Sequence, residues 1–96
     1  MPLWELDGTE DCKKVICHCL KTKPMYFEQL LLGYKTHEIR KNDRNFQVGD
    51  KLDLKEWDAG YTGRKLVFII THITNYKQKN GFVVLSIQKQ PSNIFI

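Results

Sequence analysis

The sequence predicts a small α+β fold in which about five mainly antiparallel strands and one short helix form a β-barrel. Several segments alternate apolar and polar residues with the period of a strand, whereas one segment alone has the spacing of a helix. The 96 residues suffice for one modest core. Because one short helix cannot cover both faces of a sheet, we expect the sheet to curl into a barrel with the helix at one end.

The helix is predicted over residues 24–32. Pro24 suits the first turn of a helix, and Gly33 is placed to end it. The apolar residues of this region recur at the spacing of one helical face, and they are Phe27, Leu30, Leu31 and Tyr34.

The strands are predicted at residues 15–20, 36–42, 52–54, 66–73 and 82–87. Both alternate faces of the first strand are apolar apart from His18, so we expect a central strand that is buried on both sides. In the second strand Ile39 is the one clear core residue, and Glu38 and Arg40 share the opposite face.

Two connections between these strands contain turn residues. Residues 57–64 include two glycines and two aromatic residues, and we expect them to form a loop. Residues 75–81 end in Asn80-Gly81, which is typical of the turn of a hairpin.

Charge is unevenly distributed along the chain. The first eleven residues contain four acidic and no basic side chains, and the rest contains 15 basic and 7 acidic ones. We therefore expect residues 1–12 to form a loose acidic arm and residues 13–96 to form a single basic domain. A basic surface attracts phosphates, so RNA or a nucleotide is the first partner to consider. Solubility is the alternative reason for such a surface.

The composition excludes several other classes of protein. No apolar run approaches the roughly 20 residues that cross a bilayer, so we expect no membrane protein. The N-terminus lacks the regions of a secretory signal, and the odd set of Cys12, Cys17 and Cys19 is a poor disulfide framework, so we expect a cytoplasmic protein. In a strand His18 points away from its two neighbouring cysteines, which argues against zinc. We expect no metal, no other cofactor and a monomer.

A short motif carries a resemblance to a known family. The motif Gly33-x-Lys35-x-x-Glu38-x-Arg40 follows the predicted helix, which contains Pro24-x-Tyr26-Phe27, and precedes a Val48-Gly49-Asp50 turn. This arrangement resembles the ASCH domain of the PUA-like superfamily. The segments Lys41-Asn42-Asp43-Arg44 and Tyr61-Thr62-Gly63-Arg64 resemble an uncharacterised bacterial and phage branch of that family. The resemblance implies a PUA-like barrel over residues 13–96 that binds RNA or a modified nucleoside in a cleft.

The motif also has chemistry of its own. In a strand, Glu38 and Arg40 lie about 6 to 7 Å apart on one face, and Lys35 comes just before them. A carboxylate accepts hydrogen bonds from the exocyclic amine of a base, whereas Lys and Arg side chains bind phosphate. Aromatic residues of the loop at 57–64 can stack a base. The nucleic-acid-binding candidates are Lys35, Glu38, Arg40, Asn42, Arg44, Tyr61, Arg64, Lys21 and His18.

Some of these residues also have a purely structural interpretation. Glu38 and Arg40 can form a surface salt bridge that contributes about 0 to 1 kcal/mol. His18 in an apolar strand is more often a hydrogen-bonded core histidine than a ligand. Trp57 is more typical of a core or rim residue than of a stacking platform.

An RNA- or nucleotide-binding module is the preferred hypothesis, and a hydrolase is the alternative. Some ASCH-like proteins are amidohydrolases that deacetylate N4-acetylcytidine with a lysine of this motif, a threonine three residues later and a distant glutamate. Lys35 matches the lysine, but Glu38 stands in place of the threonine. The distant acid cannot be assigned among Asp53, Glu56 and Asp58. A ribonuclease that uses Lys35 and Glu38 is a further variant.

Overall fold

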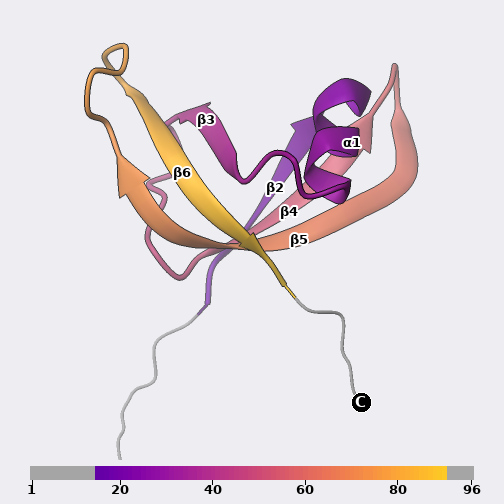
Figure 1. The fold of residues 1–96 in the computed structure, drawn as a ribbon, viewed down its shortest axis with the longest axis horizontal. Helices are drawn as coiled ribbons and strands as arrows, with labels where there is room; N and C mark the ends of the chain where they lie inside the picture. Colours follow the sequence, from indigo (N-terminus) through magenta and orange to yellow (C-terminus); the bar gives the residue numbers. More distant parts are fainter. Residues whose placement is uncertain (1–14, 91–96) are drawn as a thin grey trace, which may run out of the picture.

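The computed structural model describes residues 15–90, which form five strands and one helix (Figure 1). Their order is β2 (Cys17–Thr22), α1 (Pro24–Leu31), β3 (His37–Lys41), β4 (Lys51–Trp57), β5 (Tyr61–Thr74) and β6 (Phe82–Lys89). The predicted sequence of one strand, one helix and four strands is therefore confirmed. The predicted acidic arm at residues 1–12 lies outside the described residues.

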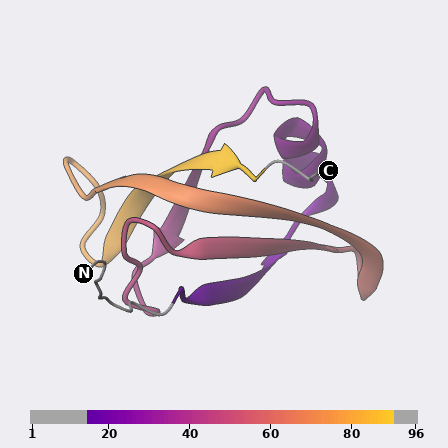
Figure 2. The same cartoon turned by 90° about the horizontal axis from the view of Figure 1, so that it is seen from below.

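The five strands form one curled sheet with the order β2-β4-β5-β6-β3. The β2–β4 pair is parallel, and the other pairs are antiparallel. Figure 1 shows the sheet curling into an open half-barrel, and Figure 2 shows α1 at one end of the strands. The 14-residue β5 pairs with β4 and with β6, and the register shifts in both ladders. Such bulges bend a strand and increase its twist, so β5 produces much of the curl.

The helix packs its apolar face on the concave side of the sheet. Phe27 and Leu30 are each 1% exposed, and Leu30 joins the sheet residues of the core. Gly33 has a φ of 83°, a left-handed conformation that ends the helix as predicted. The amides of Tyr34 and Lys35 both donate to the carbonyl of Gln29, which holds the chain close to the helix end. Among residues 15–90, no helix has the length and apolarity to cross a membrane.

The prediction of a central first strand was wrong, because β2 is an edge of the sheet. Its residues alternate between exposed and buried, with His18, Leu20 and Thr22 on the buried face. The outward face contains the exposed Cys17 and Cys19, which lie opposite His18 as predicted. The apolar residues of the segment thus do not imply a second covering layer.

The faces of β3 are also reversed relative to the prediction. Ile39 is 54% exposed, whereas Glu38 is 4% exposed. The strand is the other edge of the sheet and pairs with β6 alone among the described strands. Its inward face lies beside cations that compensate a buried carboxylate, so charge pairing overrides the apolar pattern here.

The predicted loop at residues 57–64 is mostly strand. β4 continues to Trp57 and β5 begins at Tyr61, so the turn contains three residues. Gly60 has a φ of 151° in this turn and accepts a hydrogen bond from the amide of Asp58. The rings of Trp57 and Tyr61 meet edge to face at 4.8 Å across the hairpin. The predicted turn after β5 is confirmed, and β6 follows it.

Arg64 joins the helix to the sheet. Its Nε and Nη2 donate to the carboxylate of Glu56 at 2.9 and 3.1 Å, and Nη2 also donates to Glu28 of α1 at 2.9 Å. The guanidinium lies 4.8 Å from the ring centre of Phe27. Hydrogen bonds from Arg64 and from the hydroxyl of Thr62 lower the pKa of Glu56. The register shift between β4 and β5 lets both donors reach one carboxylate.

Replacing Glu56 with Gln is expected to lower the Tm by several degrees at neutral pH, because Arg64 loses the buried one of its two charged partners. The folded pKa of Glu56 is lowered, so its stabilising effect is full above the ordinary value of 4.5 and disappears as the pH falls through the lower folded value. The Tm difference between wild type and E56Q should therefore shrink in strong acid. Thermal unfolding followed by circular dichroism across pH measures this difference.

The control for this experiment is Glu28→Gln. Glu28 binds the same arginine, but its side chain is 52% exposed, whereas that of Glu56 is 7% exposed. We expect a smaller effect for the exposed residue. A Tm difference for E56Q that stays constant into strong acid would contradict the assigned role of the charge.

Candidate ligand-binding site

A pocket of about 470 Å³ lies where the edge strands β2 and β3 approach each other beside α1. Three of its walls are the end of β2, the start of α1 and the inward face of β3. The lining residues are Lys21, Thr22, Lys23, Tyr26, Lys35, His37, Glu38, Ile39 and Arg40. The pocket thus brings together four of the predicted binding residues, namely Lys21, Lys35, Glu38 and Arg40.

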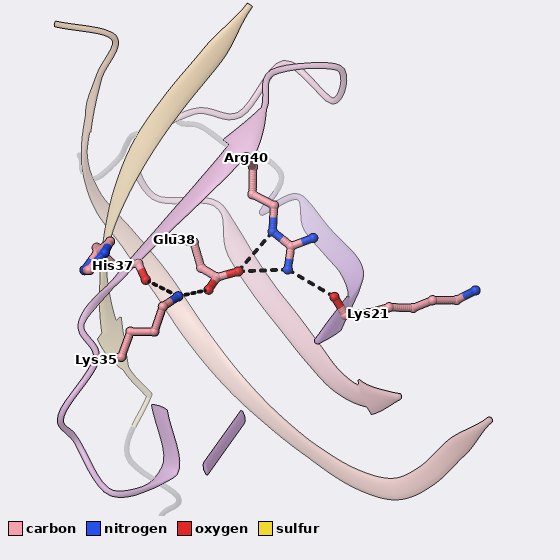
Figure 3. A network of polar contacts seen from close by, with 5 residues as sticks. All are labelled: Lys21, Lys35, His37, Glu38 and Arg40. Carbon is pink, nitrogen blue, oxygen red and sulfur yellow. Dashed lines mark hydrogen bonds and ion pairs between the residues drawn. The ribbon is translucent and has the colours of Figure 1, made fainter. Parts of the chain in front are cut away.

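The buried carboxylate of Glu38 organises this pocket (Figure 3). Lys35 Nζ donates to Glu38 Oε1 and, at 2.8 Å, to the carbonyl of His37. Arg40 donates to Glu38 Oε2 through Nε at 3.0 Å and through Nη2 at 2.8 Å. The Glu38 side chain is 5% exposed, so these charge-assisted hydrogen bonds replace its hydration. The result is a fixed orientation for both cations.

Arg40 also connects the two edges of the sheet. Its Nη2 donates to the backbone carbonyl of Lys21 on β2 at 3.1 Å. Figure 3 shows this bond continuing the line of contacts from Lys35 through Glu38. A side chain of β3 therefore binds a carbonyl on the unpaired edge of β2, where no backbone ladder joins these two described strands.

The two cations keep donors for a ligand. An ammonium has three N–H groups, and Lys35 uses two of them within the described structure. The guanidinium of Arg40 has five N–H groups, and both on Nη1 are unused by residues 15–90. Lys23 adds positive charge to the lining, against the single carboxylate, whereas the side chain of Lys21 extends away (Figure 3) to Trp57. Tyr26 supplies an aromatic wall, 41% exposed, with its ring centre 5.5 Å from Lys35 Nζ.

Thr22 is a pocket residue that the sequence analysis missed. The residue is 3% exposed, and its hydroxyl oxygen is buried without a hydrogen-bond partner in the described part of the chain. Other pocket residues were missed as well, namely Lys23, Tyr26, His37 and Ile39, the last of which was predicted as a core residue. For Thr22 a signal existed, because alternation places it on the same face as His18.

The carboxylate of Glu38, predicted to accept a hydrogen bond from a base amine, is bound to two cations in the structure. Both of its oxygens already accept hydrogen bonds from Lys35 and Arg40. These contacts use one acceptor position of Oε1 and two of Oε2, so one position on Oε1 is unused within residues 15–90. Its observed function is to hold the cations in place.

His18 lies away from this pocket and has the structural role of a core histidine. Its Nε2 donates to Asp50 Oδ2 at 2.8 Å, and that oxygen also accepts the amide of Gln47 at 3.0 Å. The imidazole meets the ring of Phe46 at 4.7 Å, edge to face. These contacts connect β2 to the turn before β4.

The remaining candidates do not line the pocket either. Asn42 Oδ1 accepts the amide of Phe46 at 3.1 Å and so shapes the connection after β3. Arg44 is exposed in the same connection. Tyr61 and Arg64 lie at the β4–β5 hairpin, where Arg64 holds α1. The nucleic-acid-binding residues predicted from the sequence therefore lie in separate parts of the molecule.

These observations define a small α+β half-barrel protein with a positively charged pocket between the two edges of its sheet. The chain belongs to the DUF3850 family, which is described as a domain of unknown function and whose sequence pattern matches residues 17–87. It is similar to an uncharacterized 12.9 kDa protein of Escherichia phage P2 that is encoded in the GpA 3′ region, with 46% identity over 59 residues. The match covers 60% of this chain and 54% of the phage protein, so the chain spans about half the length of that relative.

Replacing Glu38 with Gln is expected to reduce the free energy of unfolding by about 1 to 3 kcal/mol, because a buried charge pair loses one partner. Glu28→Gln is the matched control, since its arginine-bound side chain is 52% exposed, and we expect a loss below about 1 kcal/mol. Urea unfolding at neutral pH measures both. Equal losses of unfolding free energy in E38Q and E28Q would show that burial does not strengthen the contacts of Glu38.

Replacing Thr22 with Val is expected to raise the free energy of unfolding by about 1 kcal/mol, because the buried hydroxyl has no partner among the described residues. Thr71→Val is the control, since its hydroxyl donates to the carbonyl of Ser86 at 3.2 Å and that bond would be lost. Urea unfolding compares the two variants. A loss of stability in T22V would show that the hydroxyl has a partner in solution.

Proposed function

We propose that the pocket binds a nucleotide, either free or as part of an RNA strand, and that it does so without chemical change. The observation that carries this proposal is the pair of cations fixed by Glu38, with free N–H donors at a pocket that also has an aromatic wall. Fixed cations suit a phosphate, and an aromatic ring suits a base.

The phosphate is the part of the ligand for which the charge balance argues most directly. Arg40 and Lys35 supply N–H groups whose orientation is already set, so little side-chain entropy is lost on binding. Lys23 adds to Lys35 and Arg40, so the lining has three cations against one carboxylate. Such an excess attracts anions and releases counterions when a phosphate binds.

The base is proposed to stack on Tyr26. The ring is partly exposed and lies beside Lys35, so a base on its face would keep the phosphate within reach of the cations. A volume of about 470 Å³ is within the usual range for small-molecule sites. The hydroxyl of Thr22 is the remaining group that a ligand could satisfy.

The similarity of the motif to the ASCH domain supports the same location. Gly33 ends α1 and so places Lys35 beside Glu38, and Arg40 follows on the same face of β3. The four residues of the motif thus serve one pocket. We propose that this half-barrel is an ASCH-like member of the PUA-like superfamily and that the pocket corresponds to the cleft of that family.

A hydrolase is the less supported alternative. An activating base must reach water, whereas the Glu38 side chain is 5% exposed and already accepts three hydrogen bonds from cations. Lys35 is likewise engaged with a carbonyl and a carboxylate. These contacts favour a pocket that binds a ligand over one that activates water.

The test is calorimetric titration of the protein with the 5′-monophosphates of the four common ribonucleosides. Tyr26→Ala should weaken binding at least about fivefold through the loss of stacking. Lys35→Ala should weaken it about tenfold or more through the loss of a charge-assisted contact. The nucleotide recovered after incubation with wild type should be unchanged by chromatography.

Tyr34→Ala is the matched control. Tyr34 is 82% exposed and lies outside the pocket lining, so its removal should leave nucleotide affinity unchanged. Similar affinities for Y26A and Y34A, or no binding of any monophosphate to wild type, would overturn the proposal. A hydrolysed product would favour the enzyme instead.

A further inference from the structure

Three lysines form a row across the outer face of the sheet. Lys21 of β2 is the register partner of Lys55 of β4, and Lys55 is the partner of Lys65 of β5. Partners on neighbouring strands point to the same face and lie about 4.8 Å apart at the backbone. We call these three residues the lysine row. It faces away from the core, because the residues next to Lys55 in β4, Leu54 and Glu56, are buried.

Like charges placed opposite each other destabilise a sheet, so the lysine row is unfavourable without an anion. Asp53 compensates part of the charge, with its Oδ2 3.1 Å from Lys55 Nζ and 3.9 Å from Lys65 Nζ. Its hydrogen bond raises the pKa of Lys55, which keeps that ammonium charged. Lys21 Nζ lies 3.9 Å from the ring centre of Trp57. One carboxylate against three ammonium groups still leaves an excess of positive charge.

An aromatic surface adjoins the lysine row. Tyr61, Lys55 and Lys65 line a common hollow of about 340 Å³ at the β4–β5 hairpin. Tyr61 is 60% exposed, and its contact with Trp57 at 4.8 Å holds the ring in place. Lys21 covers one face of Trp57, which is half-buried, whereas Tyr61 is exposed, so Tyr61 is the more accessible ring for a ligand. Cations and a free aromatic ring therefore share one hollow.

We propose that the lysine row and Tyr61 form a second binding surface, which holds a single-stranded nucleic acid through its phosphates and one stacked base. Alternating phosphates and unpaired bases match a line of cations beside an exposed ring. A duplex lacks the unstacked base that Tyr61 would bind. This surface is distinct from the pocket, because its side chains lie on the opposite face of the sheet from Glu38.

The two surfaces meet at Lys21. Its backbone carbonyl accepts the bond from Arg40, whereas its side chain extends away from that network (Figure 3) and reaches Trp57 on the outer face. A strand could thus pass over the β2 edge from one surface to the other. The proposal for the lysine row does not require that the pocket bind a nucleotide.

The experiment titrates the full chain into fluorescent oligouridine and oligothymidine of about 12 nucleotides over a range of salt concentrations. RNA and DNA both offer phosphates and base faces. Binding of either oligonucleotide therefore supports the proposal if it depends on Lys55, Lys65 and Tyr61. Lys55→Gln/Lys65→Gln should reduce the magnitude of the salt slope by about 1.4, or about 0.7 for each phosphate contact. Tyr61→Ala should weaken binding at least about fivefold.

Two controls match these variants in charge and in chemistry. Lys77→Gln/Lys79→Gln removes the same charge from the exposed β5–β6 turn, and Tyr76→Ala removes a 72% exposed tyrosine from that turn. Both should bind like wild type. Equal salt slopes in the two lysine pairs, equal affinities of Y61A and Y76A, or equally tight binding of a duplex of the same length would overturn the proposal. If the loss of both lysines impairs folding, the comparison of Y61A with Y76A still tests the proposal.

The monophosphate titration distinguishes this surface from the pocket. K55Q/K65Q and Y61A should retain wild-type affinity for a mononucleotide, because Lys55, Lys65 and Tyr61 do not line the pocket. If no mononucleotide binds but oligonucleotide binding still depends on Lys55 and Lys65, the pocket proposal fails and the lysine row stands. If mononucleotides bind and the lysine row variants bind oligonucleotides like wild type, the lysine row proposal fails and the pocket proposal stands.

Discussion

The buried carboxylate of Glu38 is the constraint on which the pocket depends. A carboxylate that is 5% exposed needs charged donors, and the chain supplies Lys35 from the end of α1 and Arg40 from the same strand. Satisfying Glu38 therefore fixes the two cations that face the pocket. Arg40 then reaches the carbonyl of Lys21, so one carboxylate also influences how the edges of the sheet lie. Fold and site share the same contacts.

Much of the fold could be predicted from the sequence because the signals were local. Pro24 and Gly33 bracket the helix, and alternation defined the order of the strands. The motif from Lys35 to Arg40 could be assigned to one site because residues so close in sequence must be close in space. The core residues Leu52 and Leu54 followed from period-two alternation alone.

The errors came from interactions between distant segments. Alternation cannot tell which face of an edge strand turns inward when a buried charge network competes with Ile39 for the core. It also does not show that Tyr61 and Arg64 lie apart from the pocket, because the pairing of β4 with β5 places them at a hairpin, where Arg64 binds α1. Alternation places Thr22 on the inward face of β2 with His18, but the approach of β3 and α1 to that face, which forms the pocket, has no local signal.

The open half-barrel explains why the pocket occurs where it does. A closed barrel would pair the edges of β2 and β3, and backbone hydrogen bonds would then fill the space between them. In this chain, Arg40 contacts β2 by a side chain instead, so the space remains open beside α1. Unpaired edges tend to recruit other chains, and a charged side chain at each edge opposes that. The charges of Lys21 and Arg40 thus protect the two open edges, and Arg40 also has N–H donors at the pocket that residues 15–90 leave unused.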